Sequence, residues 1–358
     1  MAKKKSSILI TLDSMKDPNT GLYYFGKALF ESVSKQNSGK FDLNFYVEKT
    51  TGFFKKYKGL SLYHLYKFHK SFFPYYNHFD LVHITDQFCR LKPAKVKAKK
   101  ILTIHDINPV HEPGVSQEQI NIHISNLKQH IDKCDRIVTI SGFVADDIRT
   151  YFPESANKIS VIYNGADELV VEDGFLPAYI PDAPFLFTIG PLHSKKNFHV
   201  LPALLGGNNY KLVVSGITPT PAYTEQLKAE AAKFNCEDRL IITGAITDKE
   251  KAWYYKNCLA FAFPSLAEGF GLPVIEAMNF GKPAFLSKKT SLPEIGGEYA
   301  FYFENFEAGH MQSVFKDGMR KYSDYQMQPL IKNWASNFTW DRTASQYLNL
   351  YQELLNEH

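Results

Sequence analysis

Residues 264–287 read PSLAEGFGLPVIEAMNFGKPAFLS, and they combine the end of one strand, a glycine-containing loop, a short helix and a second strand. Pro273 suits the first turn of the helix, and Gly281 suits the position just after its end. A strand, a helix and a further strand in this order form the unit of a parallel α/β sheet. The stretch therefore predicts one such unit, with its loop at the carboxyl end of a strand.

The rest of the chain repeats this unit in two successive blocks. Short apolar runs predict the strands, and they lie at 7–12, 41–47, 81–85, 100–106, 136–141 and 160–165, then at 185–190, 210–216, 240–244, 259–265 and 282–287. Amphipathic stretches between them, such as 116–133, 222–234 and 248–257, predict helices. We therefore expect an α/β fold of two doubly wound domains, 1–172 and 173–339, with their junction in the proline-rich and acidic segment 167–184.

The composition is that of an ordinary globular protein. Of 358 residues, 44% are hydrophobic and 22% are charged, and 41 Lys+Arg face 37 Asp+Glu, too small an excess to indicate nucleic-acid binding. The four cysteines form no CxxC pair, which argues against a zinc site or a disulfide framework. No run approaches the roughly 20 apolar residues of a membrane span, and Asp13 closes the short run near the N-terminus. We expect a cytoplasmic protein.

The loop and helix within 264–287 carry the most chemical information. Ligands of open parallel sheets bind beyond the carboxyl ends of the strands. The glycines on either side of Phe270 let the backbone approach a ligand, and the helix start favours an anion. Glu268 and Glu276 can point into one pocket, where carboxylates bind hydroxyl groups strongly. Alternatively, Glu276 only complements the helix dipole and Glu268 is a loop-tip charge.

The string EGFGLPVIE at 268–276 resembles the donor-site signature of glycosyltransferase family 4. TIHD (103–106), VIYNGAD (161–167), TIGPLHSKKN (188–197) and SLPEIGG (291–297) follow the order and approximate spacing of that family. The resemblance implies a retaining enzyme of the GT-B fold, in which two Rossmann-like domains face one another across a cleft. It implies a UDP or GDP sugar as donor, a glycan or lipid-linked acceptor bound by the first domain, and a hexosyl transfer in cell-surface polysaccharide or glycolipid synthesis.

The resemblance also implies two residues that act on the transferred sugar and a set that holds the donor. His105 approaches the sugar from the first domain, and Glu268 contacts its hydroxyl groups. Glu276 accepts hydrogen bonds from the ribose, and Lys196 binds the diphosphate. The backbone of the loop, formed by Gly269, Phe270, Gly271 and Leu272, contacts the sugar or the diphosphate.

Further contacts with donor or acceptor are assigned to Gly21, Lys195 and Asp106. For three of the assigned residues the sequence leaves a purely structural role open. His105 could be a strand-end histidine, Lys196 a solvated lysine and Gly21 a turn residue.

One position departs from the family. An arginine usually follows the glycine of the TIG strand, and Pro191 stands there in this chain. A non-catalytic scaffold that binds nucleotide or sugar is therefore the alternative to an enzyme. The chain has no D-x-D triplet, so we expect no metal or other cofactor, and Lys196 with the helix dipole neutralises the leaving group. A glycoside hydrolase and a nicotinamide-dependent oxidoreductase fit less well, because the glutamates belong to an anion-binding loop and GFGLPV lacks the third glycine.

Two further segments predict interactions. Residues 51–80 contain five lysines, one acidic residue and many aromatics, which suits peripheral contact with the inner face of an anionic membrane, although a buried helix over 60–73 explains them as well. Residues 340–358 form an amphipathic helix with Tyr347, Leu348, Tyr351 and Leu354 on its apolar face. As in GT-B proteins, we expect this helix to pack back on the first domain.

Overall fold

The chain folds into two compact units, each of which is described by itself. The structure is a computed structural model, and it describes residues 5–18, 20–49, 51–75, 77–219 and 221–357. The first unit contains Met1–Val110, Val115–Gly165 and Thr339–His358, and the second contains His111–Gly114 and Ala166–Phe338. The chain thus leaves the first unit at Gly165 and returns at Thr339, where the sequence placed the boundaries at 172/173 and 339/340.

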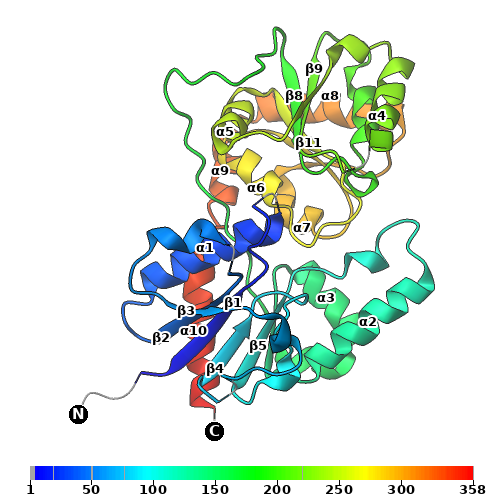
Figure 1. The fold of residues 1–358 in the computed structure, drawn as a ribbon. Coiled ribbons are helices and arrows are strands. Elements are labelled where there is room, and N and C mark those ends of the chain that lie inside the picture. The colour runs from blue at the N-terminus through cyan, green and yellow to red at the C-terminus, as the bar shows by residue number, and fades with distance from the viewer. Residues whose placement is uncertain (1–4, 19, 50, 76, 220, 358) are drawn as a thin grey trace. The chain divides into compact units, whose positions relative to one another are not determined.

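The first unit is built on a seven-stranded parallel sheet with the strand order β3-β2-β1-β4-β5-β6-β7 (Figure 1). Its strands are β1 (Ser7–Leu12), β2 (Asp42–Val47), β3 (Ser61–His64), β4 (Leu81–Ile84), β5 (Lys99–Ile104), β6 (Arg136–Thr139) and β7 (Ile159–Val161). Its α-helices are α1 (Gly21–Gln36), α2 (Gln117–Ile131), α3 (Gly142–Tyr151) and α10 (Trp340–Asn356). Its 3-10 turns are η1 (Gly52–Lys56), η2 (Lys67–Lys70), η3 (Pro93–Lys95), η4 (Asn108–Val110) and η5 (Pro153–Lys158).

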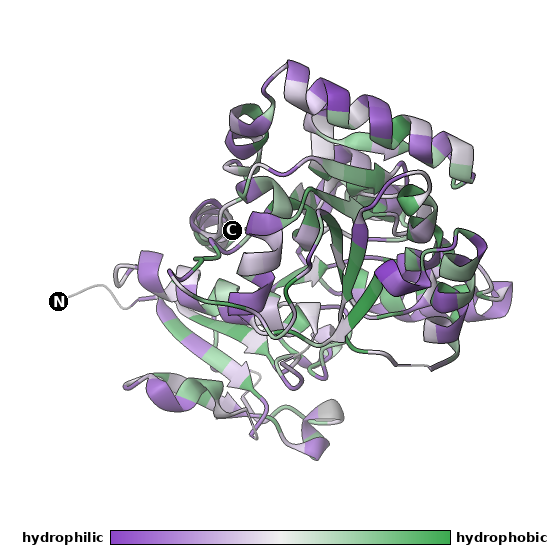
Figure 2. Cartoon of the chain, turned by 90° about the horizontal axis from the view of Figure 1, so that it is seen from above, coloured by the Kyte–Doolittle hydropathy of each residue, from purple (hydrophilic) through white to green (hydrophobic). Residues whose placement is uncertain are grey.

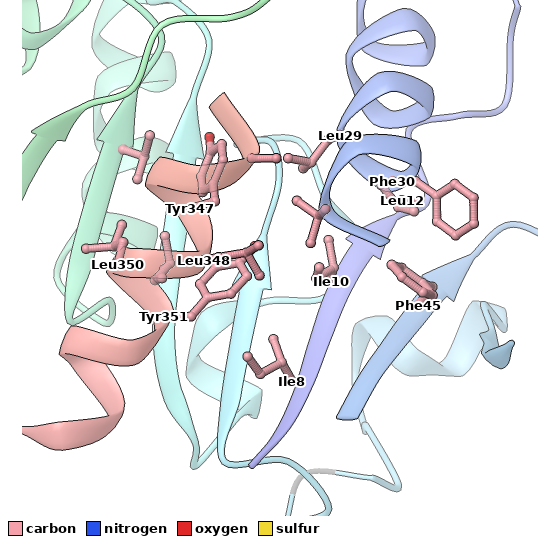
Figure 3. Packing of buried hydrophobic residues seen from close by; sticks show 14 of the residues in the cluster. Ile8, Ile10, Leu12, Leu29, Phe30, Phe45, Tyr347, Leu348, Leu350 and Tyr351 are labelled. Carbon is pink, nitrogen blue, oxygen red and sulfur yellow. The ribbon is translucent and has the colours of Figure 1, made fainter. Parts of the chain in front are cut away.

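Alternate side chains of β1 enter two different hydrophobic clusters. Ile8 and Ile10 join the cluster that contains the buried faces of α1 and α10, whereas Leu9 joins the cluster that contains residues of α2 and α3. Because successive side chains of a strand point to opposite faces, both faces of this sheet are covered. Figure 3 shows the α1 and α10 face, with Tyr347 and Leu348 of the last helix on the same side of the sheet as Ile8.

The C-terminal helix packs back on the first unit, as predicted. Tyr347 and Tyr351 are both 0% exposed. A buried polar chain ties them to the sheet: the Tyr351 hydroxyl lies 2.7 Å from His83 Nδ1, His83 Nε2 lies 2.8 Å from Thr103 Oγ1, and Thr103 Oγ1 lies 3.0 Å from the Tyr347 hydroxyl. Buried polar groups stabilise a fold only when they are hydrogen-bonded, so this chain also fixes the position of the helix on β4 and β5.

The second unit is built on a six-stranded parallel sheet with the strand order β10-β9-β8-β11-β12-β13. Its strands are β8 (Phe185–Ile189), β9 (Lys211–Ser215), β10 (Leu240–Gly244), β11 (Ala260–Phe263), β12 (Ala284–Ser287) and β13 (Phe301–Phe303). Its α-helices are α4 (Pro221–Lys233), α5 (Asp248–Asn257), α6 (Leu272–Asn279), α7 (Leu292–Gly296), α8 (Ala308–Asp324) and α9 (Gln328–Ala335). Its 3-10 turns are η6 (Ser194–Lys196), η7 (Phe198–Leu205), η8 (Glu237–Arg239) and η9 (Gly297–Tyr299).

Each apolar run predicted to be a strand overlaps one, and the two doubly wound sheets confirm the predicted α/β class. In Figure 2 the hydrophobic colour is concentrated on the strands and alternates with hydrophilic colour along the helices. No helix in the described ranges is long and apolar enough to cross a membrane.

The alternative prediction of a buried helix over 60–73 is wrong. This segment contains the short edge strand β3 and the 3-10 turn η2, and β3 pairs in register with β2 from Asn44 and Ser61 onward. Three of its aromatic side chains stay largely exposed, Tyr66 at 46%, Phe68 at 55% and Phe72 at 59%. Aromatic residues crowd every face of a helical projection here, so periodicity could not reveal an edge strand.

Candidate active site

The loop between β11 and α6 is fixed by contacts on both sides. The Phe270 side chain is 4% exposed and its ring lies 5.9 Å from that of Phe338. Ser291 Oγ lies 2.9 Å from Glu268 O and 2.8 Å from Phe270 O, and both are hydrogen bonds. Gly271 has φ +110°, and a Cβ there would lie 2.8 Å from Leu292 Cδ2, so only glycine fits. The loop therefore presents a defined backbone at the start of α6.

Glu268 is held by an ion pair with Lys196, which follows the neighbouring strand β8. Lys196 Nζ donates to Glu268 Oε1 at 2.5 Å, and Ser265 Oγ donates to the same oxygen at 2.6 Å. The two charged side chains are only 15% and 14% exposed, so water screens the pair weakly. Lys196 Nζ also lies 5.0 Å from the centre of the Phe263 ring. The residues predicted to bind sugar and diphosphate thus contact each other directly.

Glu276 is buried in α6 and is bound by two residues of α5. Lys251 Nζ donates to Glu276 Oε1 at 2.8 Å, and the Tyr255 hydroxyl donates to Oε2 at 3.0 Å. Glu276 is 4% exposed. Burial and the Glu276 carboxylate raise the pKa of Tyr255 well above its ordinary value, so the phenol remains a donor. Each carboxylate oxygen can accept more than one hydrogen bond, so a ribose hydroxyl can share Glu276 with these partners.

Glu268 and Glu276 contact different partners. That both point into one pocket therefore stays a prediction. Lys195, named as a further contact, makes an ion pair with Glu112, with Nζ 3.0 Å from Oε1. Its backbone oxygen accepts from Leu266 N at 2.8 Å and so joins the β8 turn to the β11 turn. Pro191 is exposed beside this turn.

His105 lies directly after β5 in the first unit, and its imidazole is held as a neutral ring. Nε2 lies 2.9 Å from Thr85 O. A carbonyl oxygen only accepts, so Nε2 carries the proton and Nδ1 is left as an acceptor. The ring packs edge-on against Phe25, with 4.5 Å between centres. Burial lowers the pKa of His105, opposed by the Asp86 carboxylate, the Thr85 carbonyl and Asp106.

Gln87, which the sequence analysis missed, holds the backbone on both sides of His105. His105 N donates to Gln87 Oε1 at 3.1 Å, and Gln87 Nε2 donates to Asp106 O at 2.8 Å. The amide thus continues the pairing of β4 and β5 beyond the ends of both strands. Asp106, predicted to contact a ligand, accepts from Asn108 N at 3.0 Å through Oδ1. It thereby shapes the turn that presents His105.

Gly21, assigned to a contact with donor or acceptor, is the first residue of α1. Thr20 caps this helix, because Thr20 Oγ1 accepts from Tyr23 N at 3.3 Å. No heavy atom lies within 4 Å of the place where a Cβ on Gly21 would be. The contact of Gly21 with donor or acceptor stays a prediction.

Two family models match successive parts of the chain. The model described as Glycosyltransferase Family 4 matches residues 33–168, and the model described as Glycosyl transferases group 1 matches residues 178–317. The chain belongs to the family 4, group 1 glycosyltransferases. The matched ranges include His105 and Gln87 in the first unit and Lys196, Glu268 and Glu276 in the second.

This glycosyltransferase resembles several enzymes of bacterial polysaccharides. It is 24% identical over 250 residues to the O-antigen chain mannosyltransferase RfbU of Salmonella typhimurium, which covers 66% of this chain and 69% of that protein. It is 25% identical over 276 residues to the serotype-specific mannosyltransferase WbdA of Escherichia coli. That match covers 72% of this chain but 34% of WbdA, so the chain spans about a third of that relative's length.

Solved structures confirm the GT-B fold of the glycosyltransferase. A glycosyltransferase from Rickettsia africae matches with a TM-score of 0.76 at 15% identity, over 99% of this chain and 100% of that one. HepE of Anabaena, solved in complex with UDP and glucose, matches with a TM-score of 0.68 at 16% identity, over 97% and 100% of the two chains. At these identities the likeness concerns the fold.

The partners of Glu276 in this glycosyltransferase were not predicted from the sequence. Lys251 and Tyr255 are four residues apart on α5, which places them on one helix face, and that spacing was the available signal. Gln87 gave no comparable signal, because its role depends on two strands that are distant in sequence.

Proposed function

We propose that the chain transfers a hexose, such as mannose or glucose, from a nucleoside-diphosphate sugar to a hydroxyl of a glycan acceptor, with retention and without a metal ion. The observation that carries this proposal is the Lys196–Glu268 pair on the fixed loop before α6. It sets a cation and a hydroxyl-binding carboxylate side by side, as a diphosphate joined to a sugar requires. The named mannosyltransferase relatives support a role in surface polysaccharide synthesis.

In this proposal, binding of the donor breaks the ion pair between Lys196 and Glu268. The diphosphate then binds Lys196, and Glu268 accepts hydrogen bonds from hydroxyl groups of the sugar. As the bond between the anomeric carbon and the phosphate oxygen breaks, negative charge grows on that oxygen, and Lys196 with the N–H groups at the start of α6 stabilises it. Pro191 offers no charge, so Lys196 carries a larger share of this stabilisation than in relatives with an arginine there.

Glu276 and His105 complete the proposed donor contacts. Glu276 accepts from the ribose while Lys251 and Tyr255 fix its carboxylate. The neutral His105 ring offers Nδ1 to a sugar hydroxyl, a role that needs a neutral imidazole. Retention follows when the acceptor hydroxyl attacks on the face that the phosphate leaves, with the departing phosphate oxygen taking the proton. That step needs no protein nucleophile.

Activity assays test the reaction. Purified protein is incubated with GDP-mannose or UDP-glucose and a mannose- or glucose-terminated acceptor, with EDTA or with magnesium, and the new linkage is examined by NMR. We expect an α-linked product from an α-linked donor at equal rates with EDTA and magnesium. An inverted product contradicts retention, and a strict need for magnesium contradicts the metal-free reaction. Donor binding with neither transfer nor hydrolysis favours the scaffold alternative.

We also propose a cytoplasmic location with peripheral membrane contact through residues 51–80. The exposed rings of Tyr66 and Phe68 stack with 5.7 Å between centres, and Phe72 is exposed close by in sequence. Exposed aromatics among lysines favour an anionic lipid interface. We expect Phe68→Ser/Phe72→Ser to abolish sedimentation with phosphatidylglycerol vesicles at low salt. Tyr325→Ser, which removes a ring that is 71% exposed in the second unit, is the control.

A further inference from the structure

A cavity of about 540 Å³ lies within the first unit, between the segment that follows β4 and one face of α2. It is distinct from the loop that carries Glu268. The side chains that line it come from the turn after β4, from η3 and from the middle of α2. They include Gln87, Phe88, Lys92, Lys95, His123 and His130.

The polar lining of this cavity consists of hydrogen-bond donors and amides. Two lysines, two histidines and three carboxamide side chains line it, and no carboxylate is among the described residues of its wall. Burial and the charge of Lys92 lower the pKa of His130, so the neutral form of this ring is favoured. Lys92 and Lys95 line the cavity with no carboxylate among its described residues, an arrangement that favours an anion.

His123 adds an unused donor or acceptor. Its Nε2 is buried and has no hydrogen-bond partner among the described residues. The ring lies 6.3 Å from that of Phe88, which is 64% exposed at the edge of the cavity. A buried ring nitrogen without a partner costs free energy unless a ligand or water satisfies it.

Gln87 connects the cavity to the proposed active site. Its side chain lines the cavity and also holds the backbone of His105 and Asp106, and its backbone oxygen accepts from His130. A ligand in the cavity therefore contacts the same turn that positions His105.

We propose that this cavity binds a phosphate or diphosphate ester carried by the acceptor. The inference rests on the proposed function, since it names the class of molecule that receives the sugar. Phosphate oxygens at neutral pH are acceptors, and they match the lysine and amide donors of the wall and His123 Nε2 in the tautomer that carries its proton there. The cavity is several times larger than one phosphate group, so it also admits a second phosphate or the first sugar.

Two sources share this chemistry, a lipid-linked diphosphate and a soluble sugar phosphate. Phe88 at the cavity edge and Ile122 on α2, 64% and 56% exposed, give a lipid chain an apolar surface next to the charged site. Farnesyl diphosphate and glucose 1-phosphate serve as probes of the two sources.

Calorimetry with inorganic pyrophosphate tests the site in the full-length protein. Lys196→Gln is used as the background, so that the proposed donor site contributes little. We expect Lys92→Gln/Lys95→Gln to weaken pyrophosphate binding about tenfold or more, which is about 1.4 kcal/mol. Lys58→Gln/Lys133→Gln removes two exposed lysines of the same unit outside the cavity and is expected to change the affinity less than about twofold.

The proposal is overturned if pyrophosphate does not bind the Lys196→Gln protein, or if the Lys92→Gln/Lys95→Gln change leaves its affinity intact. Tighter binding of farnesyl diphosphate than of pyrophosphate assigns the lipid source, and tighter binding of glucose 1-phosphate than of inorganic phosphate assigns the soluble one. Nucleoside diphosphate binding is measured on the same cavity variant with Lys196 intact. If the variant still binds nucleoside diphosphate, the donor site is intact even where the cavity proposal fails. If the variant no longer binds it, the cavity is not a separate site.

Discussion

Lys196 and Glu268 form an ion pair between the turns that follow two neighbouring strands, with Nζ 2.5 Å from Oε1. Both side chains are about one-seventh exposed. The sequence assigns Lys196 to the diphosphate of the donor and Glu268 to the hydroxyl groups of its sugar. The ion pair therefore fixes both side chains, and a donor must break it to bind either one.

Replacing Lys196 tests how much this residue stabilises the negative charge that grows on the departing phosphate oxygen. We expect Lys196→Gln to lower kcat about 10²- to 10³-fold, because Pro191 carries no charge at the position where the family usually has an arginine. Lys228→Gln, which removes an exposed lysine of α4 in the same unit, is the control and should change kcat less than about threefold. Steady-state kinetics with saturating acceptor measure both. Equal losses in the two variants would contradict the assignment.

Glu276→Gln tests the ribose contact. The amide keeps the size of the side chain but loses one acceptor oxygen and the charge, so we expect the dissociation constant of the donor to rise about 30-fold or more. Thermal unfolding without donor monitors the effect on Lys251, which loses one charged partner and keeps Asp248. Tyr255→Phe removes a partner of Glu276 without removing the carboxylate, and donor binding should weaken far less. A Glu276→Gln protein that folds and binds donor normally would count against the ribose role.

Gln87→Leu tests the support of His105. The change removes both hydrogen bonds to the backbone of 105–106 while keeping the volume of the side chain, so we expect a fall in kcat of about tenfold with little change in KM for the donor. A purely structural role would lower the melting temperature and leave kcat of the folded fraction unchanged. Gln129→Leu, on the cavity wall but without these bonds to His105, is the control.

Acid should destabilise the first unit through His83. Burial lowers its pKa from 6.5 to about 3 in the folded state. Below about pH 6.5 the unfolded chain binds a proton at this histidine and the folded chain does not, so stability present at neutral pH is lost as the pH falls toward 3. The slope is about 1.4 kcal/mol per pH unit for one proton. Urea unfolding of wild type and His83→Gln at several pH values should show a shallower pH dependence in the variant. Parallel curves would contradict this.

Substitution of Gly216 tests the close approach between the ends of β8 and β9 in the second unit. A Cβ there would lie 1.9 Å from Gly190 O, and φ is +141°. We therefore expect Gly216→Ala to destabilise the unit by about 2 kcal/mol or more. Gly309→Ala, in α8 with no atom within 4 Å of the new Cβ, should be neutral or slightly stabilising. Denaturant midpoints compare the two, and similar midpoints would show that the strand ends can separate.

Much of the fold was predictable because buried parallel strands are short, apolar and bounded by turn residues. β3 was not, since an edge strand carries no continuous apolar run and its aromatics face several directions. β13 was missed as well, because its sequence of three aromatics, Phe301–Phe303, is too short to show a pattern.

The candidate site was predictable where it is local in sequence. The loop from Glu268 to Leu272 and the start of α6 could be placed from glycine and proline alone. Contacts between distant segments could not: Gln87 reaches His105 only because β4 and β5 are neighbours, and Lys251 reaches Glu276 only because α5 packs beside α6.

A crystal structure with a bound nucleotide sugar is the most direct test of the central claim, that Glu268 and Glu276 bind the donor. The account predicts the Glu276 carboxylate within hydrogen-bond distance of the ribose, the Glu268 carboxylate on hydroxyls of the sugar and Lys196 Nζ on the diphosphate. A donor bound elsewhere, with Lys196 still on Glu268 and no ribose at Glu276, would contradict it.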